Sequence, residues 1–590
     1  MVQTGAGRTA AAELRRIVPI GPDARAPSVA ESDPMPRYTV TSALPYANGP
    51  IHFGHVAGAY LPADLYVRTL RMLGEEVAFI CGTDEYGVAI TLGADKAGVP
   101  YDEYVAGWHD TIRGTFEALN IEFDIWSGTS RCAEHTETAQ EFFRTLDQAG
   151  YLARREVEQL YCSTDAMFLA DRYINGTCYE CGHTEARGDE CPACGTWIAP
   201  LRLLDPSCKI CGGTPEKRPT THWYLNLPKL RDEHIGKWIE KHDWKPNVST
   251  FIKNLLKDVP ERAITRDMSW GVPLPAEYAD QGGEGKVLYV WFDAPIGYIS
   301  FTKELCAQRG DPDGWERWWK GDDVRLVHFL GKDNIPFHCM VFPSMLYGSQ
   351  QGFTLPWQVP ANEFYNLEGG KFSTSEGRTL DTADLFERYE ADALRFYIIS
   401  TLPETADAEF SLQGFVTANN AHLAGNIGNL VTRVLKFIAK NYDGRVPDFS
   451  EDHRAEMDRK ILEECGAFGD PALHAQAFQF RRAADQLVAN ASVANVFMQR
   501  LEPWALRKTD PEKAASSLNT LCEWLLWLAR WMAPFMPNKA QELWVMLGQA
   551  GRVEDQSWPG APEASTWRQL ENGAALGTPA ALFPRLDDPS

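Results

Sequence analysis

The stretch LPYANGPIHFGH, residues 44–55, decides the fold predicted for this chain, because it connects two segments of different periodicity. Residues 38–40 before it form an apolar run typical of a strand, and residues 56–73 after it have the amphipathic spacing of a helix. His52 and His55 stand about one helical turn apart where this helix begins. Unpaired N–H groups and the helix dipole favour anions at that position, so the stretch predicts a phosphate site.

A second motif, GGKFSTS at residues 369–375, lies in a glycine-flanked stretch far downstream. Its lysine, Lys371, adds positive charge where negative charge grows during transfer at the α-phosphate of ATP. Alone, an H-x-G-H pair is more often an ordinary surface or core feature, and a lysine-and-serine loop is usually a solvated turn. The two motifs together, in this order, predict a site for the triphosphate of ATP.

Two longer motifs lie between them, YVWFDAPIGY at residues 289–298 and GKDNIPFH at residues 331–338. The histidine and lysine motifs resemble the nucleotide motifs of class I aminoacyl-tRNA synthetases, and the longer motifs are similar to the amino-acid pocket of methionyl-tRNA synthetases. The resemblance covers about residues 37 to 544. It implies a ligase that converts methionine and ATP to methionyl-adenylate and transfers the acyl group to tRNA(Met), with Mg²⁺ bound to the ATP.

Strand-like runs alternate with helical patterns in two stretches of the chain, which predicts an α/β fold with a parallel sheet. We expect strands near residues 38–40, 77–82, 287–291 and 324–330, and helices near 101–119, 426–440, 477–499 and 517–531. The resemblance implies a Rossmann-like sheet, split by a zinc-knuckle connective insert and followed by a C-terminal α-helical anticodon-binding bundle. Pro62 interrupts the first helix and predicts a kink there.

The same patterns give the expected domain boundaries. The expected parts are a flexible N-terminal tail (1–36), the first half of the catalytic domain (37–131), the connective insert (132–286), the second half (287–362), a stem-contact segment with the lysine loop (363–425), the helical anticodon domain (426–574) and a tail (575–590). The N-terminal segment lacks the apolar core of a secretory signal, and a disordered tail is favoured over a transit peptide.

Composition and charge limit the classes of function. At 590 residues with 44% hydrophobic residues, the chain is long enough for several globular domains. The net charge of −23 argues against non-specific coating of nucleic acid, but a local basic patch would still allow tRNA binding. No apolar run reaches the roughly 20 residues that a membrane span requires, so we expect no membrane partner, and we expect a monomer.

Thirteen cysteines, several of them in C-x-x-C pairs, indicate metal ligands in a reducing compartment such as the cytoplasm rather than disulfides. Two such pairs predict a tetrahedral Zn²⁺ site formed by Cys178, Cys181, Cys191 and Cys194. A third pair has a C-x-x-D partner, which offers a second site formed by Cys162, Asp165, Cys208 and Cys211. Relatives with two knuckles carry a cysteine where Asp165 stands, so the sequence leaves one zinc ion or two open. A redox role is less favoured, because the pairs lie in glycine-rich knuckles.

The resemblance assigns the remaining site residues. For ATP it implies His52, Gly54, His55, Lys332, Lys371 and Ser373, with His52, His55, Lys371 and Arg266 acting in the activation step. For methionine it implies Leu44, Tyr46, Asp84, Trp291, Ala294, Pro295, Tyr298, Asn334, Phe337 and His338. Asp84 matches the position that pairs with the α-amino group, and aromatic faces suit the soft sulfur of the side chain. For the anticodon, whose unpaired bases stack on aromatic rings, it implies Asn429, Arg433 and Trp504.

The lysine loop departs from the family pattern K-x-S-K-S, because Thr374 replaces the second lysine. Loss of one such charged group typically costs on the order of 10²–10³ in rate. Two alternatives therefore stay open. One is a paralogue with the same chemistry, either a resistance copy or a supplier of activated methionine to a biosynthetic pathway. The other is a catalytically silent tRNA-binding protein, against which the intact pair His52 and His55 argues.

Overall fold

A parallel sheet positions the site in this computed structural model, which describes residues 36–169, 173–188, 191–194, 198–368, 382–563 and 567–588. The strand order is β14-β13-β1-β2-β3, and each neighbouring pair runs parallel. The strands are β1 (Arg37–Ser42), β2 (Glu76–Thr83), β3 (Ile125–Gly128), β13 (Val324–Gly331) and β14 (Ala361–Asn362). This arrangement confirms the predicted Rossmann-like fold.

Different helices cover the two faces of this sheet. α2 (Leu61–Met72) packs on β1 and β2, and α10 (Gly297–Gln308) packs on β2 and β3. Neighbouring residues of β2 alternate between the faces: Phe79 belongs to the same core as α2, whereas Ala78 and Ile80 belong to the same core as α10. Because both faces are buried, a ligand has access at the carboxyl ends of the strands.

The first helix contains an irregular turn. α1 (Phe53–His55) continues as a π-helical turn, η2 (Val56–Tyr60), before α2 begins. Pro62 lies in the first turn of α2, directly after η2. A proline lacks the N–H that the interior of an α-helix requires, and the wider π turn accommodates this loss. Where a kink was predicted at Pro62, the structure has a π turn directly before the proline.

The strand predicted over residues 287–291 is wrong in its second half. β12 (Val287–Leu288) is short, and it is followed by the helix α9 (Val290–Asp293), which carries Trp291. Tyr289 is the extended N-cap residue of α9, and the N–H groups of Phe292 and Asp293 donate to its carbonyl. A short apolar run is compatible with either a strand or a buried helix, and for this reason the sequence pattern predicted a strand where α9 lies.

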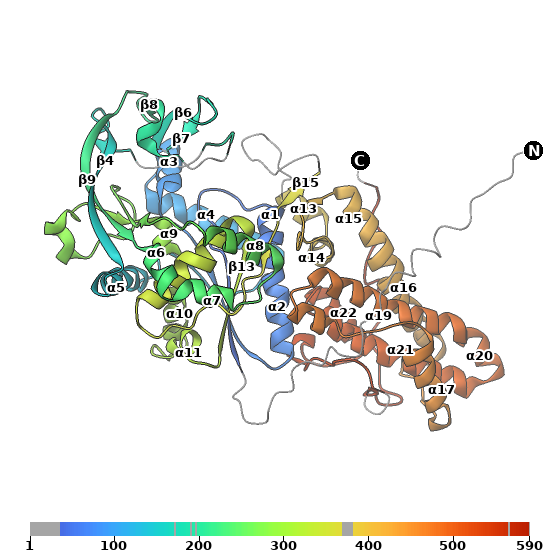
Figure 1. Cartoon of the computed structure of the whole chain (residues 1–590). Helices are drawn as coiled ribbons and strands as arrows, with labels where there is room; N and C mark the ends of the chain where they lie inside the picture. Colours follow the sequence, from blue (N-terminus) through green and yellow to red (C-terminus); the bar gives the residue numbers. More distant parts are fainter. Residues whose placement is uncertain are drawn as a thin grey trace, which may run out of the picture. The chain divides into compact units, whose positions relative to one another are not determined.

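The connective insert is built on a long antiparallel ribbon (Figure 1). β4 (Leu152–Cys162) and β9 (Glu216–Leu225) pair along this ribbon. A smaller sheet of order β7-β6-β8 carries the cysteine knuckles, and its strands are β6 (Ile174–Thr177), β7 (Ala186–Arg187) and β8 (Leu204–Cys208). The insert therefore has its own sheets, separate from the parallel sheet.

The C-terminal part is helical, as predicted. Its longer helices are α16 (Asn429–Asn441), α19 (Phe480–Leu501), α21 (Pro511–Met532) and α22 (Pro537–Met546). The helix predicted over residues 517–531 is part of α21, and four of its apolar residues form a stripe at helical spacing that is fully buried: Leu521, Trp524, Leu525 and Leu528. Within the described ranges, no helix is long and apolar enough to cross a lipid bilayer.

Residues 575–588, the described part of the segment expected to be a tail, pack against the C-terminal helices. Leu582 and Phe583 are buried, and the side-chain amide of Asn420 donates to the carbonyl of Leu586 at 2.8 Å. Two apolar residues in a polar stretch give too weak a pattern to predict such packing.

One buried arginine joins the C-terminal helices to a helix of the parallel-sheet part. Arg395, on α14 (Ala391–Ser400), has no exposed surface. Its Nη2 donates to Asp64 of α2 at 2.7 Å and to the carbonyl of Pro534 at 2.9 Å, while Nε donates to the carbonyl of Phe535 at 3.0 Å. A single side chain thus connects α2 to the turn between α21 and α22.

Candidate active site and metal clusters

The two histidines form a capping box at the start of α1. His52 is the N-cap residue, and its Nδ1 accepts a hydrogen bond from the N–H of Gly54 at 3.1 Å. The N–H of His52 donates to Nδ1 of His55 at 3.2 Å, and the two rings stack with centroids 3.9 Å apart. Both Nδ1 atoms accept, which places the hydrogen of each neutral ring on Nε2.

Burial keeps both imidazoles neutral near pH 7. Burial, with a smaller contribution from His55, lowers the pKa of His52 from 6.5 to about 3, and burial lowers the pKa of His55 to about 4. Gly54 permits this packing, since an added Cβ would lie 2.8 Å from the His52 ring and from the carbonyl oxygen of Tyr365. The two rings therefore offer N–H donors, not cations, beside a helix N-terminus.

The cations predicted near the phosphates are only partly described. Lys371 and Ser373 lie outside the described residues. Lys332 is described, and its Nζ contacts the carboxylates of Glu363 at 2.8 Å and Asp407 at 2.9 Å. The charge of Lys332 is compensated in this arrangement, so a phosphate would have to compete with one of these carboxylates.

Arg266 lies on β11 (Thr265–Arg266), which pairs with β12. Its guanidinium carbon is 3.9 Å from the centroid of the Tyr289 ring, and Nη1 donates to the carbonyls of Ala263 at 3.1 Å and Thr265 at 2.9 Å. Because Tyr289 caps α9, Arg266 lies directly beside the helix that carries Trp291.

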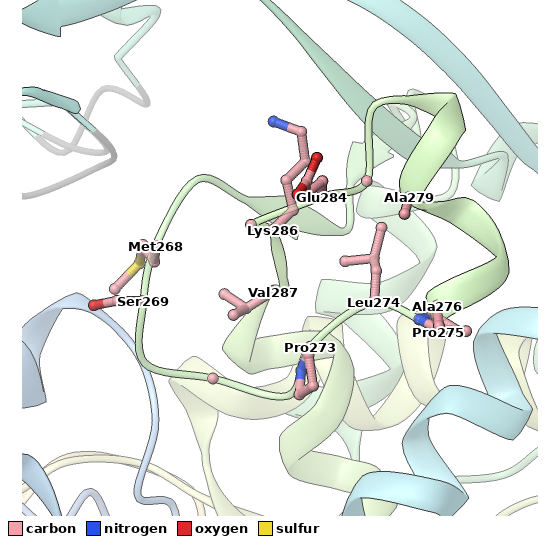
Figure 2. Close-up of a pocket in the computed structure, with 13 residues that line it drawn as sticks. Met268, Ser269, Pro273, Leu274, Pro275, Ala276, Ala279, Glu284, Lys286 and Val287 are labelled. Carbon is pink, nitrogen blue, oxygen red and sulfur yellow. The ribbon is translucent and has the colours of Figure 1, made fainter.

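The loop after Arg266 borders an open cavity of about 350 Å³ (Figure 2). Figure 2 shows this cavity between the loop with Met268 and Ser269 and the segment with Leu274 and Ala276. Among the described residues that line it, none is predicted to bind ATP or methionine. This cavity is therefore distinct from the predicted substrate site.

Three aromatic side chains from separate segments meet at the predicted methionine pocket. Trp291 Nε1 donates to the hydroxyl of Tyr46 at 2.7 Å, and the Trp291 ring packs edge-on against Phe337 with centroids 4.4 Å apart. Tyr46 comes from the loop after β1, and Phe337 begins the π-helical turn η9 (Phe337–Val341). Aromatic surfaces of this kind suit the polarizable sulfur of a thioether.

A neutral hydrogen-bonded pair forms another part of this pocket. His338 Nδ1 faces the carbonyl of Asn334 at 3.2 Å, and since a carbonyl only accepts, Nδ1 carries the hydrogen. His338 Nε2 then accepts from the hydroxyl of Tyr298 at 2.9 Å. Burial lowers the pKa of His338 to about 4, so the lining is uncharged near pH 7. The other apolar residues of the predicted set lie in the turn between α9 and α10 or against its end: Ala294, Pro295 and Leu44.

The predicted partner of the α-amino group is a buried carboxyl group. Asp84 directly follows β2 and is 3% exposed. Its N–H donates to the carbonyl of Pro45, and its carbonyl accepts from the N–H of Ala47, each at 2.9 Å. Burial, reinforced by the nearby Asp293, raises the pKa of Asp84 well above its ordinary value. Such a group is stabilised as a carboxylate when a cation binds beside it.

Two buried residues of the site, Asp293 and His135, are not predicted by the sequence patterns. Neither side chain is exposed, and Nε2 of His135 lies 3.3 Å from Oδ2 of Asp293. An acid within the apolar motif YVWFDAPIGY is the signal that could have marked Asp293. His135 begins α5 (His135–Gln148), and no local pattern distinguishes it.

The structure brings the first predicted set of metal ligands together. The four sulfur atoms, from Cys178, Cys181, Cys191 and Cys194, lie within 4.8 Å of one another. Cys178 and Cys194 have sulfurs 3.9 Å apart, and Cys181 and Cys191 have sulfurs 3.7 Å apart. A tetrahedral ion with Zn–S bonds of about 2.3 Å places its sulfurs about 3.8 Å apart, so this donor set fits zinc.

The second predicted set also comes together. Oδ2 of Asp165 lies 3.1 Å from the sulfurs of both Cys162 and Cys208, and the sulfur of Cys211 lies 3.4 Å from that of Cys162. All four ligand atoms lie within 4.8 Å of one another. Zinc accepts a carboxylate oxygen beside thiolates, so this donor set fits a site with three cysteines and one aspartate.

The predicted anticodon residues lie on two helices of the helical domain. Asn429 and Arg433 are on α16, and Trp504 is on α20 (Pro503–Thr509). The guanidinium carbon of Arg433 lies 5.6 Å from the centroid of the Trp504 ring, which belongs to a residue that is 38% exposed. An exposed ring beside an arginine offers a stacking surface for an unpaired base.

Known proteins match this chain over most of its length. Residues 38–435 match the family model of class I tRNA synthetases (M), and residues 452–590 match the anticodon-binding domain of methionyl-tRNA ligase. A methionine–tRNA ligase of Protochlamydia amoebophila is 43% identical over 552 residues, which cover 93% of this chain and 77% of the relative. That of Rubrobacter xylanophilus is 42% identical over 562 residues, which cover 92% of this chain and 95% of the relative.

A solved structure is similar as well. The methionyl-tRNA synthetase of Mycobacterium tuberculosis in complex with methionyl-adenylate is 26% identical, with a TM-score of 0.73. The similarity covers 93% of this chain and all of that chain. Both family models and the relatives above agree with the motifs and the fold. The chain therefore belongs to the methionyl-tRNA synthetases, a family of class I aminoacyl-tRNA synthetases.

Proposed function

We propose that this chain is a methionine–tRNA ligase, which activates methionine with ATP and transfers the methionyl group to tRNA(Met). The observation that carries the proposal is a neutral aromatic pocket next to a buried carboxyl group, Asp84, whose backbone is bonded to the loop of the histidine motif. The pocket suits an uncharged thioether side chain, Asp84 suits an α-ammonium group, and the helix start suits phosphates.

In the first step, a carboxylate oxygen of methionine attacks the α-phosphorus of ATP, and pyrophosphate leaves as methionyl-adenylate forms. No side chain forms a covalent bond; the chain holds the reacting groups in line and stabilises the charge that develops. His52 and His55 donate N–H bonds from Nε2 to phosphate oxygens, and Arg266 and Lys371 add positive charge. Mg²⁺ bound to ATP supplies further charge neutralisation.

In the second step, a hydroxyl of the terminal ribose of tRNA attacks the carbonyl carbon of the adenylate, and AMP leaves. The helical domain binds the distant anticodon, where an unpaired base stacks on Trp504 beside Arg433. The amino-acid pocket and the anticodon surface therefore select the two substrates separately.

Both cysteine clusters hold one zinc ion each in this proposal, in a structural role, because four protein ligands leave no open coordination position. Metal-bound thiolates of this kind suit a reducing compartment such as the cytoplasm. Metal analysis of the purified chain should give two zinc ions, and Cys178→Ser should lose one of them and destabilise the insert. A single zinc ion in the wild type, lost in Cys178→Ser, would restrict the metal to the first cluster.

The direct test of the function is an ATP–pyrophosphate exchange panel over the amino acids. Exchange should depend on methionine and should be far weaker with the other amino acids. Absence of exchange with every amino acid would leave the catalytically silent tRNA-binding alternative. Complementation of a strain depleted of its own methionine–tRNA ligase separates a housekeeping enzyme from a specialised paralogue. The paralogue alternative rests on Thr374, which replaces the second lysine of the lysine loop.

A further inference from the structure

The proposed mechanism does not use Asp293, although this acid lies at the ammonium end of the pocket. It ends α9, its side chain has no exposed surface, and it is near enough to act on the pKa of Asp84 and Tyr86. Oδ1 of Asp293 has no hydrogen-bond partner among the described residues, while Oδ2 faces Nε2 of His135 at 3.3 Å. A fully buried acid with one oxygen that lacks a donor requires a physical explanation.

The hydrogen bonds of His135 indicate where protons lie. Its Nδ1 is 2.8 Å from Oγ of Ser300, and that oxygen is also 3.0 Å from the carbonyl of Ile296. Because a carbonyl only accepts, we assign the hydroxyl hydrogen to Ile296, which makes Nδ1 of His135 the donor to Ser300. Neutral His135 then presents the lone pair of Nε2 to Asp293. Two facing lone pairs would repel each other, so a proton lies between these two residues.

The proton is more stable on the carboxyl group of Asp293 than on Nε2 of His135. As a carboxylate, Asp293 would bury a negative charge beside Asp84 with an oxygen that has no hydrogen-bond partner among the described residues, which is costly. As a carboxylic acid it donates to Nε2 of His135 and leaves only a neutral carbonyl oxygen without a donor. Burial acts in the same direction on both partners, because it raises the pKa of Asp293 and lowers the pKa of His135 to about 3.

The neighbouring acid Glu85 is already compensated. Its carboxylate accepts from Nε of Arg131 at 2.8 Å and from the N–H of Ser130 at 3.1 Å. Three other titratable groups face this cluster and are neutral near pH 7, since burial lowers the pKa of His109 to about 4 and raises the pKa of Tyr86 and Cys132. Asp84 is therefore left as the acid without a cationic partner in this cluster.

We propose that Asp293, protonated and held by His135, is a positioning residue that leaves Asp84 as the single negative charge offered to the substrate's α-ammonium group. One ammonium then meets one carboxylate. A second carboxylate would have to lose its hydration without a second cation to balance it. The identity of the substrate rests on the proposed function, whereas the protonation of Asp293 does not.

The protonation of Asp293 is visible by infrared difference spectroscopy on the whole, metal-bound chain near pH 7. A protonated carboxyl group has a carbonyl band that an ionised carboxylate lacks. Asp293→Asn should remove one such band from the wild-type spectrum. Ser300→Ala keeps both the acid and the imidazole, so it should shift this band without abolishing it. If Asp293→Asn removes no carbonyl band, or if Ser300→Ala fails to affect the band, the proposal is wrong.

Equilibrium binding of methionine tests what this protonation does. Asp293→Asn keeps a neutral N–H donor toward His135, so it should raise the methionine Kd by less than about fivefold. Asp293→Leu removes that donor and should raise the Kd by about tenfold or more. Asp84→Asn removes the charge itself and should raise the Kd on the order of 100-fold. The Kd for ATP, measured on the same three variants, is the control. It should stay near the wild-type value, whereas a general loss of folding would raise it together with the methionine Kd.

Two outcomes separate this proposal from the proposed function. If Asp293→Asn raises the methionine Kd as much as Asp84→Asn does, Asp293 is ionised and the proposal is overturned. If the wild type shows no preference for methionine, the proposed function fails, while the infrared band still decides whether Asp293 is protonated.

Discussion

The amino-acid pocket and the phosphate side of the site are built differently. In the pocket, side chains bind each other: Trp291 donates to Tyr46, and Tyr298 donates to His338. On the phosphate side, the histidines bind their own backbone, and Lys332 is paired with two carboxylates. The pocket is thus preformed around an uncharged ligand, whereas positive charge for the phosphates is expected to gather only when ATP binds.

This difference implies that the pocket and the phosphate side contribute to different steps, binding and reaction. A preformed neutral pocket contributes mainly to ground-state binding and selectivity, because little reorganisation is needed when the ligand enters. Charges that reach the phosphates during the reaction act mainly in the transition state, so their loss lowers the rate more than the affinity. Changes on the two sides should therefore affect different measured constants.

The largest effect is expected on the phosphate side. Lys371→Ala should slow single-turnover adenylate formation on the order of 10²–10³, because it removes a cation that acts in the transition state. Lys253→Ala, an exposed lysine on α8 (Pro246–Leu255), is the matched control and should retain the wild-type rate. If the methionine Kd of Lys371→Ala rose as much as its rate fell, the separate roles of the two sides would be contradicted.

Acid pH should lower the stability of the fold through three histidines, from both sides of the site, whose pKa is lowered in the folded chain. The folded-state pKa values are about 3 for His52 and about 4 for His55 and His338, against 6.5 for the ordinary group. The unfolded chain therefore binds more protons below about pH 6.5, and the free energy of unfolding falls as the pH drops toward about 4.

Urea unfolding at about pH 7 and about pH 5 measures this change, and the midpoint should be lower at the acid pH. In His338→Gln the difference between the two midpoints should shrink, because one of the depressed groups is gone. A difference that stayed the same in His338→Gln would show that His338 does not contribute to it.

The smallest effect is expected for the hydrogen bond between Trp291 and Tyr46 in the pocket. Tyr46→Phe removes the hydroxyl that accepts from Trp291 Nε1 but keeps the ring, so the KM for methionine should rise by about 2–10-fold with little change in kcat. Tyr161→Phe, in the connective insert, is the control. A loss confined to kcat would place Tyr46 on the phosphate side of the comparison.

The features predicted correctly from the sequence are those that residues close together in the sequence determine. The C-x-x-C and C-x-x-D pairs carry their metal-binding geometry in their spacing, and both sets come together in the structure. The stripe on α21 follows from helical periodicity, and all four of its residues are buried.

Long-range partners could not be predicted in this way. Asp293 meets His135 across 158 positions of sequence, and Lys332 meets Asp407 across 75. Tertiary packing alone brings these residues together, so no window of sequence contains the pair. The helix at Trp291 was missed for a different reason, because a short apolar run is compatible with either a strand or a buried helix.

The division between the two sides is tested most directly by the equilibrium Kd for methionine, measured without ATP in Asp84→Ala and His52→Gln. Asp84→Ala should raise this Kd on the order of 100-fold, because the α-ammonium group loses its buried partner. His52→Gln should leave the Kd within about twofold of the wild type while it slows adenylate formation. If both variants raised the methionine Kd to a similar extent, the pocket and the phosphate side would not be separable, and the account would be contradicted.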